Sequence, residues 1–149
     1  MSDLTIKVRK KESCEDLPLP SYMSAGSSGM DLYADVESEL VIEPGDIKMV
    51  SAGIYISIPQ GFEAQIRPRS GLAAKHGISI VNTPGTIDAD YRGLINIILI
   101  NLGKNAYTVK RGMRIAQMVI NKVSRAGLDL VNELDVTARN TGGFGHTGV

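Results

Sequence analysis

The chain has 149 residues, of which 43% are hydrophobic, and it is therefore long enough for one domain with a substantial core. Sixteen Lys and Arg balance sixteen Asp and Glu, so no net charge would attract nucleic acid or an anionic membrane surface. The single cysteine, Cys14, excludes an internal disulfide and a multi-cysteine metal site, and two histidines argue against a histidine metal site.

The amino end shows no sign of a targeting segment. No apolar run reaches the roughly 18 residues of a membrane span, and no charged-then-apolar leader begins the chain. We therefore expect a soluble, cytoplasmic protein.

Strand signals dominate the sequence. Short runs of alternating or continuous apolar residues are separated by turn sequences rich in Gly, Pro and Asn. We predict strands at residues 5–8, 54–58, 62–67, 78–81, 94–100 and 113–120. Helical periodicity is almost absent, so the expected fold is all-β: an antiparallel, jelly-roll-like β-barrel with one short helix.

One predicted strand has apolar residues on both of its faces. Residues 94–102 are apolar except at Asn96 and Asn101. A strand of this kind is normally covered on both sides. We therefore predict that it is buried on both sides.

The one predicted helix covers residues 71–76. Ser70 stands where it could cap the amino end, and Gly77 where it could close the carboxyl end in the left-handed conformation. The unpaired N–H groups at such an amino end, with Arg69 beside them, suit a phosphate group. The same pattern also fits an ordinary capped helix that joins two strands.

Residues 82–93 lie between two predicted strands and form the main candidate for a functional loop. Pro84 and Gly85 predict a turn in which the glycine adopts backbone angles that other residues avoid. Two aspartates, a tyrosine and an arginine follow within residues 88–92. Binding and catalytic groups are often placed on such loops. A solvated, acidic hairpin tip is the alternative.

The segment 139–149 differs from the rest of the chain. It contains four glycines and one large apolar residue, Phe144, and it cannot form a core of its own. We therefore predict a β-domain at 1–138 followed by a flexible arm at 139–149. An arm with an arginine, an aromatic ring and a threonine suits closure over a ligand with a phosphate and a flat base. A disordered tail is the alternative.

Five separated stretches resemble, in order and spacing, the five motifs of the trimeric deoxyuridine triphosphatase (dUTPase) family. They read SGMDLYA at 28–34, PRSGLA at 68–73, Asn82 with GTIDADYRG at 85–93, RIAQ at 114–117, and the arm from Arg139. One such stretch would be weak evidence. Five of them span nearly the whole chain, which makes the resemblance specific.

The resemblance implies a jelly-roll-like domain that forms a homotrimer, with three active sites that each draw on three subunits. It also implies hydrolysis of dUTP to dUMP and pyrophosphate by attack of water on the α-phosphorus, with Mg²⁺ as cofactor. This reaction would limit uracil incorporation into DNA and supply dUMP for dTMP synthesis. No nucleic-acid or membrane partner is implied.

The resemblance also implies how the nucleoside is bound. Asp88 resembles the catalytic aspartate that orients and activates water. Tyr91 resembles the residue beneath the deoxyribose that leaves no room for a ribose 2′-OH, and Asp90 would stabilise the loop. The residues implied to contact uracil and deoxyribose are Asn82, Gly85, Thr86, Ile87, Asp88, Tyr91 and Phe144.

A second group of residues resembles the family's phosphate and metal ligands. Asp31 would hold Mg²⁺ through water molecules, which agrees with the reluctance of Mg²⁺ to lose its water. Arg114 could be a phosphate ligand, although a structural ion pair is the preferred interpretation. The residues implied to contact the phosphates are Arg69, Ser70, Gly71, Gln117, Arg139, Gly145, His146 and Thr147.

Two other functions fit parts of the sequence. The related dCTP deaminases share the fold, but PRSGLA and the tyrosine after Asp90 fit a dUTPase better. The second alternative is a trimeric regulatory protein that binds dUTP without turning it over. The presence of Asp88 and of a nearly complete arm argues against it.

Overall fold

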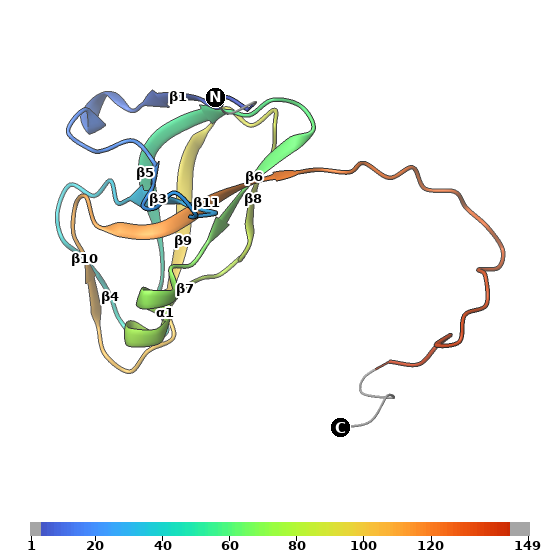
Figure 1. Ribbon diagram of the computed structural model, residues 1–149. Helices are drawn as coiled ribbons and strands as arrows, with labels where there is room; N and C mark the ends of the chain where they lie inside the picture. The colour runs from blue at the N-terminus through green and yellow to red at the C-terminus, as the bar shows by residue number, and fades with distance from the viewer. Residues whose placement is uncertain (1–3, 144–149) are drawn as a thin grey trace.

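The computed structural model describes residues 4–143, which form an antiparallel β-domain with an extended carboxyl end (Figure 1). The helical elements are a 3-10 turn, η1 (Glu12–Cys14), and a helix, α1 (Ser70–His76), between β6 and β7. The strands are β1 (Lys7–Lys10), β2 (Ser21–Tyr22), β3 (Met30–Tyr33), β4 (Leu40–Ile42), β5 (Ile47–Ser57), β6 (Phe62–Arg67), β7 (Ile78–Ile80), β8 (Gly85–Ile87), β9 (Leu94–Asn101), β10 (Tyr107–Val109) and β11 (Arg114–Lys122).

All of these strands pair in antiparallel fashion. One sheet has the order β1-β5-β9-β7, a second has the order β2-β3-β11-β6-β8, and β10 and β4 form a two-stranded ribbon. The inward residues of both large sheets belong to one buried apolar cluster. The all-β, jelly-roll-like fold predicted from the sequence is confirmed, although the sheets remain separate rather than closing into a continuous barrel.

Alternation along β6 explains how this sheet covers the core. Ala64 and Ile66 point inward and are almost completely buried, whereas Glu63, Gln65 and Arg67 point to the opposite face. The bounds of β6 agree with the strand predicted at 62–67. Polar groups therefore line the outer face of the sheet that carries most of the candidate site.

Strand β9 is buried on one face, and the prediction of burial on both faces is wrong for the single chain. Ile95, Ile97 and Leu99 are inaccessible, but Asn96 is exposed and the residues between them are only partly covered. Asn101 is an inward polar residue with 0% exposure. Its amide donates hydrogen bonds to two main-chain oxygens and accepts one from Gly103 N–H, so its polar atoms are satisfied in the core.

The amino-terminal strand and the shortest strands departed from expectation. Pairing with residues 54–57 of β5 places β1 at Lys7–Lys10 rather than at 5–8. The strands β2, β3, β4, β8 and β10 were not predicted, because two to four residues carry too little periodicity. Their positions depend on the partner strands.

The ends of α1 test two capping predictions. Arg69 is the residue at the amino cap and makes no side-chain capping bond, so the prediction that Ser70 caps the helix is wrong. Ser70 is instead the first helical residue. The prediction for Gly77 is confirmed: its φ is 70°, and its N–H donates to the oxygens of Ala73 and Leu72.

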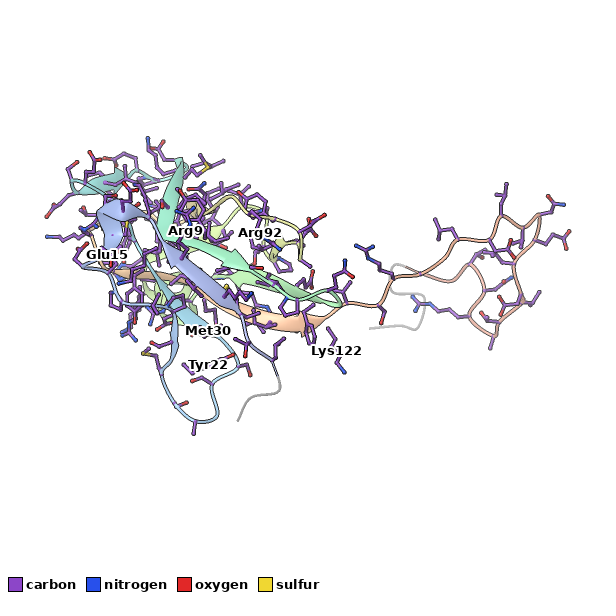
Figure 2. The ribbon with its side chains drawn as sticks, turned by 90° about the horizontal axis from the view of Figure 1, so that it is seen from above. Arg9, Glu15, Tyr22, Met30, Arg92 and Lys122 are labelled. Carbon is purple, nitrogen blue, oxygen red and sulfur yellow. The ribbon has the colours of Figure 1, made fainter. Side chains whose placement is uncertain are left out.

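Beyond Lys122 the chain leaves the β-domain, as Figure 2 shows from above. Residues 123–143 contain no strand or helix. Four apolar side chains here are more than four-fifths exposed, namely Leu128, Leu130, Leu134 and Val136. Within residues 4–143, no helix has the length and apolar character required to cross a membrane.

A buried ionic cluster fastens the amino-terminal segment to the domain. The Asp35 side chain is 3% exposed, and its carboxylate pairs with Lys11 Nζ and Arg111 Nη1, each at 2.9 Å. Burial alone would raise the pKa of Asp35. Hydrogen bonds from Lys11, Cys14, Arg111 and Ser51 outweigh that effect and lower the pKa to about 2.

We predict that Asp35→Asn lowers the free energy of unfolding by about 2 kcal/mol at pH 7. A carboxylate with a lowered pKa stabilises the fold above its ordinary pKa of 3.8, and this contribution is lost as the pH falls towards about 2. Urea unfolding at one protein concentration, between pH 7 and pH 2, measures the effect. The exposed Asp129→Asn is the control. A difference between wild type and variant that stays constant over this range would contradict the assignment.

Candidate active site

The loop predicted at residues 82–93 contains a strand of its own. Gly85 begins β8, which pairs with β6 in the five-stranded sheet, whereas the flanking β7 and β9 belong to the four-stranded sheet. Gly85 is a strand residue without positive φ, so the predicted left-handed turn is wrong. The Thr83–Pro84 peptide before it is cis.

Strand β8 forms an edge that could read a nucleobase. It is the outermost strand of its sheet, so alternate N–H and C=O groups of this strand point away from β6. The Asn82 side chain covers the start of the strand, since a Cβ on Gly85 would lie 3.3 Å from Asn82 Nδ2. The structure therefore brings together Asn82, Gly85, Thr86 and Ile87, the described residues predicted to contact uracil.

Asp88 and Tyr91 occupy the loop that follows β8. Asp88 is exposed, and its main-chain oxygen accepts a hydrogen bond from Tyr91 N–H at 3.1 Å. The Tyr91 hydroxyl donates to the main-chain oxygen of Leu94 at 3.1 Å. The phenol ring lies so close to Gly93 that a Cβ there would overlap it. The ring is therefore held against Gly93 and Leu94.

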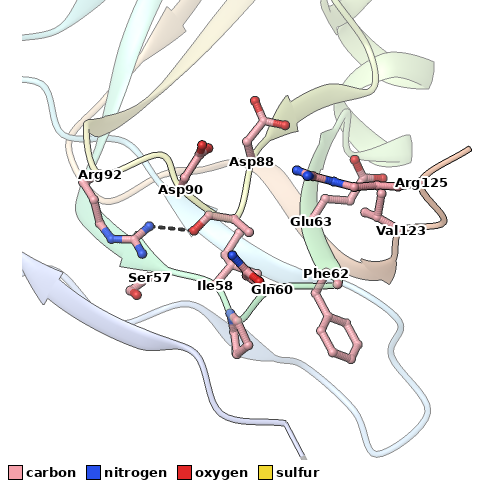
Figure 3. A pocket seen from close by; sticks show the side chains of 13 residues that line it. Ser57, Ile58, Gln60, Phe62, Glu63, Asp88, Asp90, Arg92, Val123 and Arg125 are labelled. Carbon is pink, nitrogen blue, oxygen red and sulfur yellow. Dashed lines mark hydrogen bonds between the residues drawn. The ribbon is translucent and has the colours of Figure 1, made fainter. Parts of the chain in front are cut away.

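A pocket of about 920 Å³ adjoins Asp88 (Figure 3). Its charged lining consists of Glu63, Asp88 and Asp90 with Arg92 and Arg125. Figure 3 shows the Arg125 side chain extending across the pocket between Asp88 and Glu63. The pocket thus places acidic and basic groups around an exposed carboxylate.

A second group of predicted residues gathers around Asp31 on β3. Gln117 lies opposite Asp31 in the pairing of β11 with β3, and Gln117 Nε2 donates to Pro68 O at 2.9 Å. The Asp31 carboxylate pairs with Arg69 Nε at 3.3 Å and with Arg114 Nη1 at 3.0 Å. The structural ion pair preferred for Arg114 is confirmed. Asp31, Arg69 and Gln117 therefore form one cluster, with Arg69 and Gln117 as its groups able to donate to an anion.

Ser70 and Gly71 extend this cluster at the exposed start of α1. The N–H groups of Leu72 and Ala73 donate to Arg69 O. The N–H groups of Ser70 and Gly71 precede this helical pattern. A Cβ on Gly71 would meet no atom within 4 Å, so the main chain here is open to a ligand.

The two groups stand apart within one chain. Asp88 follows Ile87, which lies opposite Ala64 of β6, whereas Gln117 lies opposite Arg67. With about 3.3 Å per residue along a strand and about 4.8 Å between strands, an offset of about four residues and two strand spacings separates Asp88 from Gln117 by about 16 Å. A single chain therefore does not place the catalytic candidate beside the phosphate candidates.

The described residues fit a metal that arrives with the substrate better than a metal held by the protein. Across residues 4–143, no three His, Cys, Asp or Glu side chains cluster closely enough to hold an ion. Asp31 offers one carboxylate, whose two oxygens already face arginines but retain further lone pairs. Such a group can accept from the water shell of a Mg²⁺ bound mainly by phosphates.

Of the predicted arm ligands, Arg139 alone lies within the described residues. It is exposed, and its Nε donates to Gly142 O at 2.8 Å. Phe144, Gly145, His146 and Thr147 lie outside the described part of the chain.

Sequence analysis did not find Glu63 and Arg125 as neighbours of Asp88. These residues come from β6 and from the segment after β11, and no motif or spacing connects them with the loop. Only the pairing of strands distant in sequence places them around the same pocket.

Comparisons with known proteins identify relatives of nearly the whole chain. The dUTPase family profile matches residues 15–148. The deoxyuridine 5'-triphosphate nucleotidohydrolase of Thermoanaerobacter sp. (strain X514) is 56% identical over 146 residues, 98% of this chain and 99% of that protein. The corresponding protein of Syntrophotalea carbinolica is 55% identical over 148 residues, 99% of each.

Solved structures share the fold. The Staphylococcus bacteriophage 80alpha dUTPase with dUPNHPP has a TM-score of 0.87 and 25% identity, covering 97% of this chain and 99% of that chain. A mutant dUTPase of S. aureus phage phi11 has a TM-score of 0.78 and 23% identity, covering 89% and 99%. The latter structure concerns a structural Mg(II) ion in that protein.

The two large sheets and their shared core define a jelly-roll-like β-protein, with its candidate site residues in two clusters. The chain belongs to the dUTPase family.

We predict that Gly93→Ala displaces the Tyr91 ring and breaks its hydrogen bond to Leu94 O, because the added Cβ would overlap the ring. The ring is the end of a side chain and moves more easily than the strands, so stability should change by about 1 kcal/mol or less. A crystal structure and thermal unfolding measure these effects. Gly127→Ala is the control, since a Cβ there meets nothing within 4 Å. An undisplaced Tyr91 would contradict the prediction.

Proposed function

We propose that this chain is a dUTP diphosphatase, which hydrolyses dUTP to dUMP and pyrophosphate. The observation that carries the proposal is the exposed Asp88 carboxylate, which lies directly after an edge strand and in the same loop as Tyr91, whose hydroxyl donates to Leu94 O. Membership of the dUTPase family across residues 15–148 supports it.

Asp88 acts as the general base in this proposal. It orients a water molecule and accepts its proton while the water oxygen bonds to the α-phosphorus. The bond from the α-phosphorus to the oxygen bridging it to the β-phosphorus breaks, and pyrophosphate leaves on the opposite side. Little covalent chemistry is required of the protein, so correct positioning of Asp88 is its main contribution.

Selection of the nucleoside rests on β8 and on Tyr91. The free edge of β8 presents main-chain donors and acceptors, and Asn82 adds an amide at the start of that edge. Uracil pairs with these groups, and a narrow fit excludes the methyl group of thymine. The Tyr91 ring packs beneath the deoxyribose and leaves no room for a 2′-OH, which discriminates against UTP.

The cluster around Asp31 binds the triphosphate. Arg69 and Gln117 contact phosphate oxygens, and the N–H groups of Ser70 and Gly71 donate to them. Bound Mg²⁺ would neutralise charge on the phosphate oxygens and on the leaving pyrophosphate. Asp31 would hold it through water. From the arm, Arg139, Gly145, His146 and Thr147 would contact the γ-phosphate end, and Phe144 would stack on uracil.

Assembly into a homotrimer would complete this site. Asp88 and Gln117 of one chain, separated by about 16 Å, are too far apart to contact the same α-phosphate group. Loops and clusters from different subunits can instead meet. The almost fully exposed Leu128 and Leu130 of the extended segment support association, because such side chains favour burial against a partner.

The substrate is a small molecule, and the protein is expected to act in the cytoplasm. The balanced charge of the chain supports the absence of nucleic-acid and membrane partners. The arm at 139–149, appended to a domain at 1–138, closes over bound dUTP and excludes water from the site.

We predict that wild-type protein releases pyrophosphate from dUTP with Mg²⁺, and that EDTA abolishes the release. UTP, dTTP and dCTP should be poor substrates. UTP adds a 2′-OH in the sugar pocket, dTTP adds a methyl group at the 5-position of uracil, and dCTP presents an amino group to the edge that reads the base. Pyrophosphate release from the four nucleotides is the measurement. Equal release from all four, or none from dUTP, would overturn the proposal.

In the same assay, Asp88→Asn should lower turnover by about 10² to 10⁴, the usual contribution of a positioned base. Binding of dUPNHPP should be retained, because Asn preserves the size of the side chain. Calorimetric binding of that analogue is the control. Unchanged turnover would remove Asp88 from the mechanism.

Deletion of residues 139–149 should abolish most dUTP turnover and leave the trimer intact, because the arm closes the site but does not build the domain. Light scattering and pyrophosphate release measure the two effects. Dissociation of the truncated protein, or full activity, would show that the division between domain and arm is wrong.

A further inference from the structure

We infer that Arg92 is a positioning residue for the loop that carries Asp88 and Tyr91, an inference that rests on the proposed function of this loop. Arg92 Nη1 donates hydrogen bonds to the main-chain oxygens of Ala89 at 2.7 Å and of Tyr91 at 2.8 Å. Figure 3 shows the side chain beside the loop, with the first of these bonds drawn. One guanidinium nitrogen therefore joins two peptide groups on either side of Asp90.

This contact matters because the loop has little regular structure to support it. Residues 88–93 contain no strand or helix, and Asp88, Tyr91 and Arg92 are all exposed. Two further hydrogen bonds, Tyr91 N–H to Asp88 O and Tyr91 OH to Leu94 O, connect the loop to itself and to the start of β9. Exposed segments with few buried contacts open readily, so hydrogen bonds from one side chain to two carbonyls of the loop oppose its opening.

The chemistry proposed for the loop depends on such restraint. A general base must lie within hydrogen-bond reach of its water, and a displacement of about 1 Å can cost about a hundredfold in rate. The Ala89 carbonyl lies between Asp88 and Tyr91 along the chain, and the Tyr91 carbonyl directly follows the residue that carries the sugar-facing ring. Fixing both peptide groups therefore sets Asp88 and Tyr91 relative to each other.

Arginine suits this role better than lysine. The two hydrogens of one terminal nitrogen lie in the guanidinium plane and diverge in a fixed geometry, so they can serve two carbonyls at once. A lysine ammonium keeps the charge and has three donors, but its side chain is shorter and its donors rotate freely. Arg92→Lys therefore separates the effect of charge from the effect of the bridged geometry.

Direct contact with substrate phosphate is the competing role for Arg92, since it lines the pocket beside Asp88. The two roles differ in kinetics. If Arg92 bound a phosphate group equally in the bound substrate and in the transition state, its loss would raise KM. If Arg92 positions the loop, its loss lowers kcat with little change in KM. Loss of positioning should also weaken the preference for dUTP over UTP, because Tyr91 belongs to the same loop.

The test compares wild type, Arg92→Ala, Arg92→Lys and Arg9→Ala in the full-length protein. Arg9 is a matched control: it lies on β1, and its guanidinium stacks on Tyr55 at 3.9 Å rather than on the loop. The measurements are kcat and KM for dUTP and UTP, thermal unfolding, and hydrogen exchange of a peptide that covers residues 88–94.

We expect Arg92→Ala to lower kcat for dUTP and the dUTP-to-UTP preference by about tenfold each, with KM for dUTP within about twofold of wild type. Arg92→Lys should recover part of kcat. Exchange across residues 88–94 should accelerate in Arg92→Ala and remain unchanged in Arg9→Ala, with similar unfolding temperatures for all variants.

Unchanged exchange across residues 88–94 in Arg92→Ala would overturn the inference, as would an unchanged kcat with a raised KM. Full recovery of kcat in Arg92→Lys would assign the effect to charge and would also overturn it. Failure of wild type to hydrolyse dUTP would refute the proposed function separately, since the exchange measurement reports on the loop without any substrate.

Discussion

The registers that β6 makes with β11 and with β8 determine where the proposed site residues lie. On one side Arg67 lies opposite Gln117, and on the other Ile66 lies opposite Gly85. A slip of one residue in either pairing would exchange the inner and outer faces of the strand. Burial of Ala64 and Ile66 in the core prevents such a slip. Apolar packing on one face of the sheet thus fixes the polar groups on the other.

Two aspartates show how surroundings separate structural from chemical roles. Asp35 is buried and paired with two basic side chains, and these contacts tie distant segments together. Asp88 is exposed at a pocket, and the hydrogen bonds around it hold the main chain of its loop and leave the carboxylate available. Asp31 is intermediate: it is nearly buried and paired with arginines, but it belongs to the cluster that resembles a phosphate site.

Features that depend on local sequence were predicted well. Alternation located β6, and the glycine that ends α1 adopts the expected left-handed conformation. The errors arose where tertiary contacts compete with local preference. Gly85 follows a proline and resembles a turn residue, but pairing with β6 makes it a strand residue. Ser70 resembles a cap, but the helix begins one residue earlier, so Arg69 takes that position.

The amino-acid sequence by itself determined the β-rich class, the order of the motifs and most residues of the candidate site. Alternation, turn residues and short motifs are properties of neighbouring positions in the chain. Only the tertiary structure decided that β8 joins the opposite sheet from β7 and β9, and that Glu63 and Arg125 share a pocket with Asp88. The same pairings separate Asp88 from Gln117 within one chain, by about 16 Å at ideal strand spacings. These facts follow from pairing between strands far apart in sequence, where cooperative packing of the whole core selects one register.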